Sequence, residues 1–192
     1  MTPFELFLRL GIGHITDIKG YDHIVFLIAL CTTLTFKDWR RLLLIITFFT
    51  LGHTLTLLMA AFGLVNVHGA TVEFLIALTI FITGLTNLTK KGQANSGKLK
   101  YWMGGIFGLI HGLGFSRYYS MIAEGTNAWI SLPSFTLGIE LGQVIIVIAF
   151  LILAWLLENA FTVGKRDWNL ILSGGVLGIA LVMMLERLPE VF

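Results

Sequence analysis

The sequence predicts an all-α, polytopic transmembrane helix bundle with six spans and one further helix at the N-terminus. Of the 192 residues, 56% are hydrophobic and only 12% are charged, which is about half the charged share of soluble domains. The mean hydropathy is +0.87. The apolar residues also fall into separate runs, and a run of roughly 17 to 25 such residues crosses a bilayer as a helix.

The first element is the segment 3–12, in which apolar residues such as Phe4 and Phe7 recur at helical spacing. Glu5 and Arg9 lie on another face of the same helix. This amphipathic pattern is typical of a helix that lies in the membrane interface, and a partial span is the alternative. Because both charges interrupt the apolar stretch and no small-residue cleavage site follows, a cleavable signal peptide is not expected.

Six apolar runs follow, separated by charged or turn-forming stretches. The predicted spans are 21–36, 41–63, 71–88, 101–120, 132–157 and 169–187. Together they occupy most of the chain and leave no room for a soluble domain. We therefore expect residues 1–192 to form a single transmembrane domain.

The basic residues predict the orientation of these spans. They gather in three alternate loops, formed by Lys37, Arg40 and Arg41, by Lys90, Lys91, Lys98 and Lys100, and by Lys165 and Arg166. The remaining loops carry little positive charge. By the positive-inside rule the basic loops are cytoplasmic, so both termini face outward. The segment 93–98 is expected to be a flexible connector.

Charge and cysteine content exclude several kinds of partner and linkage. The net charge is only +2, and the basic residues form short clusters, so nucleic-acid binding is not expected. The lipid bilayer is the expected surrounding, and a homo-oligomer or a membrane-complex partner stays open. The single cysteine, Cys31, excludes an internal disulfide and is expected to pack as a small core residue.

Few ionisable side chains lie inside the apolar runs, where they are costly and usually functional. The candidate metal ligands are His14, Asp22, His23, His53, His111 and Glu140, with Glu73, Gln143 and Ser116 as supporting residues. On the predicted topology all candidate ligands lie between the outer surface and the midplane, and the cytoplasmic halves hold no ionisable group. Imidazole nitrogens with carboxylates suit zinc, nickel, cobalt or iron, and the same groups can also relay protons.

The adjacent pair Asp22 and His23 points in two directions, because neighbouring residues on a helix are about 100° apart. We therefore expect one of them to bind the metal and the other to orient it or to close the site. His14 approaches from the preceding segment. Glycines accompany the polar residues, as in Gly52-His53 and His111-Gly112, and small residues let helices approach closely.

Five separated motifs, GYDHIVF, FTLGHTLTL, VEFLIALTI, FGLIHGLGF and FTLGIELGQ, resemble the HupE/UreJ family of bacterial membrane proteins, and its second branch most closely. The resemblance extends from about Phe4 to the last span. It implies a small polytopic protein of the inner membrane. Family members encoded with nickel enzymes are regarded as nickel or cobalt permeases that need histidines and acidic residues in their spans. In the permease pattern, fewer residues separate the histidine from the Asp-His pair. In this sequence, seven residues lie between His14 and Asp22.

Three functions are compatible with these residues. The first is transport or handling of a divalent cation of the nickel/cobalt class. The second is an intramembrane hydrolase, in which histidines hold zinc and Ser116, Tyr118 or Glu73 assists. The third is a structural subunit of a membrane complex. The lack of ionisable groups in the cytoplasmic halves favours a site that is closed on that side, as in an enzyme. The family resemblance favours transport, and we therefore predict transport or handling of a divalent cation.

Overall fold

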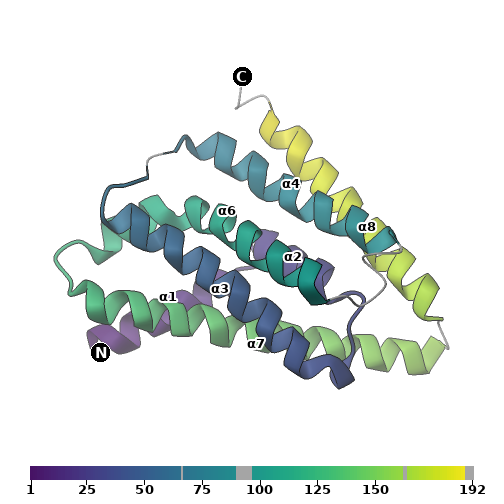
Figure 1. Cartoon of the computed structure of the whole chain (residues 1–192). Helices are drawn as coiled ribbons and strands as arrows, with labels where there is room; N and C mark the ends of the chain where they lie inside the picture. Colours follow the sequence, from purple (N-terminus) through teal and green to yellow (C-terminus); the bar gives the residue numbers. More distant parts are fainter. Residues whose placement is uncertain (66, 90–96, 162–163, 189–192) are drawn as a thin grey trace.

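The computed structural model describes residues 1–65, 67–89, 97–161 and 164–188. These residues form helices joined by short connections, and no strand occurs among them (Figure 1). The helices are α1 Pro3–Thr16, α2 Asp22–Cys31, α3 Trp39–Ala61, α4 Gly69–Leu88, α6 Gly97–Ala123, α7 Ala128–Phe161 and α8 Lys165–Arg187, with a 3₁₀ turn at Phe36–Asp38. The all-α prediction is confirmed for this part of the chain.

Each of the six predicted spans falls on a helix, but among the described residues four helices are long and apolar enough to cross a membrane: Phe36–Ala61, Gly69–Leu88, Ala128–Phe161 and Lys165–Arg187. Helix α2 has 10 residues and is therefore about 15 Å long, half the thickness of a bilayer core. Helix α6 has 27 residues, but its glycines, together with His111 and Lys100, lower its apolar content.

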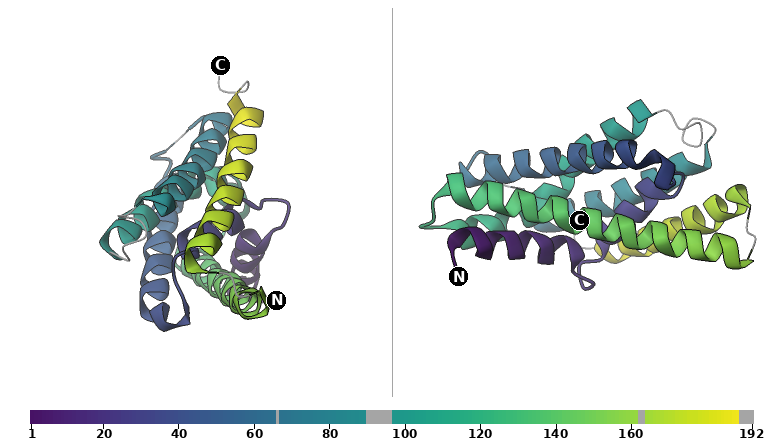
Figure 2. Two further views of the ribbon diagram at one scale, coloured as in Figure 1. Left: turned by 90° about the vertical axis from the view of Figure 1, so that its right-hand side faces the viewer. Right: turned by 90° about the horizontal axis from the view of Figure 1, so that it is seen from below.

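Helix α1 packs along α7 and is part of the bundle (Figure 2). A capping box starts the helix: Glu5 N donates to the Thr2 hydroxyl and Thr2 N donates to the Glu5 carboxylate, which satisfies two N–H groups that have no partner within the helix. Gly11 of α1 and Gly138 of α7 meet, because a Cβ atom on either glycine would overlap the backbone of the other helix. The predicted N-terminal helix is thus present and is held against α7.

Helices α3 and α6 approach each other equally closely. A Cβ atom on Gly52 would overlap the backbone at Gly105, and a Cβ atom on Gly108 would overlap the carbonyl of Phe49. One turn further along, a Cβ atom on Gly112 would lie 2.6 Å from the carbonyl oxygen of His53. These contacts lie beside His53 and His111, so the same glycines that join the two helices also bring both histidines into the interior.

The prediction that Lys100 lies in a cytoplasmic loop is wrong. Lys100 is 5% exposed and stands within α6, where its ammonium donates to the carbonyl of Leu30 at 2.7 Å and to the hydroxyl of Thr33 at 2.6 Å. The Asn87 amide donates to Ala29 O at 2.6 Å. These donors satisfy carbonyls at the C-terminal end of α2, which have no partner within the helix. Lys100 is thus an ionisable group inside the bundle at the C-terminal end of α2, where the sequence analysis expected none.

Other predictions fall partly outside the described residues. They concern Lys90, Lys91 and most of the connector 93–98, which lie outside the described residues. Cys31 is buried and forms no disulfide, as expected for a core residue.

The α3 to α6 contact yields a stability prediction. We expect Gly108→Ala to destabilise the protein by about 1–3 kcal/mol, because the added methyl group has no space against the Phe49 carbonyl. Thermal unfolding in detergent micelles, followed by circular dichroism, measures the change. Gly174→Ala is the matched control, since nothing lies within 4 Å of a Cβ atom there. Equal stability of the two variants would contradict the close approach of α3 and α6.

Candidate metal centre

Three histidines from three different helices meet inside the bundle. His14 lies in the last turn of α1, His23 is the second residue of α2, and His53 lies in the middle of α3. One ring nitrogen from each lies within 4.8 Å of the others. We refer to these three residues as the histidine cluster. His53 is fully buried and His23 is 4% exposed, so two of the three rings are withdrawn from bulk solvent.

The ring nitrogens of this cluster lack hydrogen-bond partners. His14 Nε2, His23 Nε2 and both nitrogens of His53 are buried with no partner. A buried polar atom left unpaired costs folding free energy, and such atoms are rare in folded proteins. A metal cation can pair with several such nitrogens when they lie close together, as they do here within 4.8 Å, so these residues fit a bound cation.

Asp22 fixes the orientation of the His23 ring. One oxygen of its carboxylate, Oδ1, accepts a hydrogen bond from the His23 backbone N–H at 2.8 Å and lies 3.0 Å from His23 Nδ1. With a proton on Nδ1, the lone pair is on Nε2, which is buried without a hydrogen-bond partner. A carboxylate behind a histidine ligand raises the basicity of the ring and holds its position in many metal sites.

His111 stands next to the cluster, with its ring centroid 5.0 Å from that of His23. Its Nε2 atom lies 3.0 Å from the hydroxyl of Thr79. That hydroxyl donates its hydrogen to Ile76 O at 2.7 Å, so it can only accept from His111. His111 therefore carries its proton on Nε2, and its Nδ1 lone pair is buried without a partner.

Glu140 and the supporting residues occupy other positions. The Glu140 carboxylate accepts from the Thr47 hydroxyl at 2.6 Å between α3 and α7 and is not a member of the histidine cluster. Gln143 lies one turn further along α7, beside Thr50. The Ser116 hydroxyl donates to Leu113 O and lines a different cavity. The structure thus separates the predicted nitrogen ligands from Glu140.

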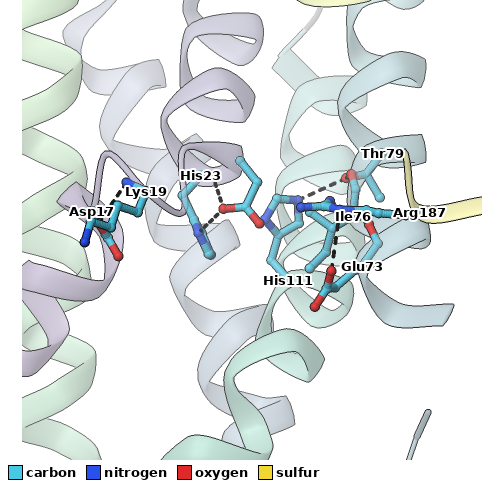
Figure 3. A network of polar contacts seen from close by, with 9 residues as sticks. Asp17, Lys19, His23, Glu73, Ile76, Thr79, His111 and Arg187 are labelled. Carbon is cyan, nitrogen blue, oxygen red and sulfur yellow. Dashed lines mark hydrogen bonds and ion pairs between the residues drawn. The ribbon is translucent and has the colours of Figure 1, made fainter. Parts of the chain in front are cut away.

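A cavity of about 250 Å³ leads to the histidine cluster. Its lining includes three histidines, His14, His23 and His111, and four charged residues, Asp17, Asp22, Glu73 and Arg187. Arg187 Nε lies 3.6 Å from the Glu73 carboxylate, and Arg187 Nη1 donates to Glu73 O at 2.9 Å. Figure 3 shows this pair on the side of His111 that faces away from His23. With three carboxylates and one guanidinium in its lining, the cavity has a negative electrostatic potential, which favours cations.

Sequence reasoning missed some of the residues around this cavity. Neither Asp17 nor Arg187 is among the candidate residues of the sequence analysis. Both lie at the ends of helices, where charged residues are ordinary, so the sequence held no signal that they share a cavity. Thr79 orients His111, yet threonines are common in apolar helices. Only the fold, which brings the end of α1 and residues of α4 and α8 to one cavity, identifies these residues.

Comparisons with known proteins give one match. Curated proteins and solved structures both returned none. The family model described as HupE / UreJ protein matches residues 1–187. This range includes every helix and every residue of the site described above, and the chain belongs to the HupE/UreJ family.

Proposed function

We propose that this protein binds a divalent cation of the nickel, cobalt or zinc class at His14, His23 and His53 and carries it across the bacterial inner membrane. The observation that carries the proposal is the convergence of unpaired, buried imidazole nitrogens from three helices. Neutral imidazole is the ligand that these borderline metals prefer. Membership of the HupE/UreJ family also supports membrane metal handling.

The surroundings of the cluster support capture of a cation. The carboxylates of Asp17, Asp22 and Glu73 raise the local concentration of cations at the cavity. His111 offers a fourth buried lone pair next to His23. In the proposed orientation, with basic loops in the cytoplasm and both termini outside, the cavity receives cations from the outer side.

A zinc-dependent hydrolase is the second candidate. It is favoured by the cavity beside the three histidines, because catalytic zinc sites combine three protein ligands with an open position for water or substrate. Of the predicted helpers, only Glu73 lines this cavity, whereas Ser116 lines another. The two candidates share the metal site and differ in whether the ion crosses the membrane.

Metal content tests the site itself. Purified protein that is incubated with nickel, cobalt or zinc and then desalted should retain a stoichiometric amount of metal, measured by inductively coupled plasma mass spectrometry. His53→Ala should lose that metal, because it removes the most deeply buried ligand. His68→Ala alters an exposed histidine outside the cluster and should retain it. A wild-type protein without metal would refute both metal-dependent functions and favour a structural role.

Asp22→Asn tests the orienting carboxylate. The amide keeps the shape of the side chain but lowers the basicity of His23, so the metal affinity should fall by about 10- to 100-fold. Competition with a chromophoric chelator measures this affinity. Asp17→Asn changes a carboxylate of the same cavity that does not contact a histidine and should have a smaller effect. An unchanged affinity in Asp22→Asn would mean that the carboxylate does not act through His23.

Transport is tested in proteoliposomes that contain a fluorescent metal indicator. The wild type should produce a time-dependent rise in internal metal, and His53→Ala should not. If metal binds tightly but never enters the vesicles, the transport proposal fails and the hydrolase candidate gains support.

A further inference from the structure

A second group of polar side chains lies between α3 and α7. It consists of Thr47 and Thr50 on α3 and Glu140 and Gln143 on α7, and we call it the oxygen cluster. The Thr47 hydroxyl donates to Glu140 Oε1 at 2.6 Å, and Thr50 Oγ1 lies 3.0 Å from the Gln143 amide. Each pair on one helix has the spacing i, i+3, which places its side chains next to each other.

This cluster has buried polar atoms without partners. Glu140 Oε2 is one of them, and the Gln143 amide group, on a fully buried side chain, supplies another. Thr50 Oγ1 lies 3.0 Å from both Ile46 O and Gln143, and a hydroxyl has only one hydrogen. Both contacts are satisfied when the Gln143 nitrogen donates to Thr50, which leaves the amide oxygen as the unpaired atom.

Glu140 also has no counter-charge among the residues that the structure describes. None of the ion pairs found among the described residues involves it. A carboxylate inside an apolar bundle is costly unless a cation accompanies it. The histidine cluster does not provide one, because Glu140 lies outside it.

The donor atoms define the cation. A carboxylate, an amide oxygen and two hydroxyls are hard ligands, which favour alkali and alkaline-earth cations over nickel or zinc. One negative charge in an apolar environment is neutralised by one positive charge, which favours a monovalent ion. A carboxylate has a strong local field, which favours the smaller of the common monovalent ions.

We propose that Thr47, Thr50, Glu140 and Gln143 form a binding site for a sodium ion. This site is separate from the histidine cluster, although both use α3, on which Thr50 and His53 are three residues apart. The proposal rests on the oxygen cluster alone and does not depend on metal transport.

Sodium-dependent stability tests the site in the full-length protein, purified without transition metals and reconstituted in nanodiscs. Sodium chloride should raise the unfolding temperature in a saturable way when choline chloride keeps the ionic strength constant. Glu140→Gln should abolish this rise, and Thr47→Val should increase the midpoint sodium concentration by about tenfold through loss of one ligand. Glu186→Gln, at an exposed glutamate, should behave as the wild type.

Further variants separate this proposal from the others. His53→Ala should keep the sodium response even though it loses transition-metal binding, so the two sites fail independently. If Glu140→Gln does not fold, Thr47→Ser should retain the response that Thr47→Val weakens. An equal response to potassium, a sodium response that survives in Glu140→Gln, or no sodium response in the wild type would overturn the proposal. In the last case, a stability that depends on pH alone would indicate that Glu140 carries a proton.

Discussion

Close approach of helix backbones at glycine is the constraint on which the rest of this structure depends. Gly11 meets Gly138 where α1 packs on α7, and Gly52 and Gly108 join α3 to α6. In a bilayer, helices gain little from burying apolar surface against one another, so van der Waals contact at small residues carries much of the association. Both contacts lie beside histidines, so the packing that joins these helices also holds His14 and His53 in the interior.

The buried polar groups of the interior are of two kinds, those with hydrogen-bond partners and those without. At the C-terminal end of α2, Lys100 and Asn87 donate to the carbonyls of Leu30 and Ala29. Asn169 extends this network by donating to Asn87 O at 2.9 Å. At the histidine cluster and the oxygen cluster, by contrast, buried nitrogens and oxygens have no partner. Asn87 Oδ1 is the exception in the network around Lys100, since it too is buried without a partner. The other unpaired buried atoms of the described residues lie at the histidine cluster, at the adjacent His111 and at the oxygen cluster, which marks these as places where a ligand completes the structure.

The sequence predicted the helices and the polar candidates, and it failed to predict how the candidates group. Long apolar runs have one stable form in a membrane, so the helices followed directly. The rotation of each helix about its axis has no comparable signal in the sequence. This rotation determines that His53 faces α1 and α2, whereas Glu140 faces Thr47. Lys100 was misplaced because it follows other lysines in sequence, although it stands one turn inside α6. Only tertiary contacts distinguish a buried lysine from its exposed neighbours.

The short helix α2 explains the depth of the histidine cluster. His23 is the second residue of this helix and Cys31 the last, so about 12 Å of helix separates the cluster from the polar network around Lys100. Helix α1 approaches from the opposite end of the bundle and stops at Thr16, and Figure 2 shows α2 continuing beyond it. Together the two helices make one interrupted passage through the bundle. Irregular backbone at such a depth is tolerated where it lines a polar cavity. Asp17 and Gly20, which lie in the interruption, line the same cavity as His14 and His23, so the segment between the two helices forms part of the wall of the metal centre.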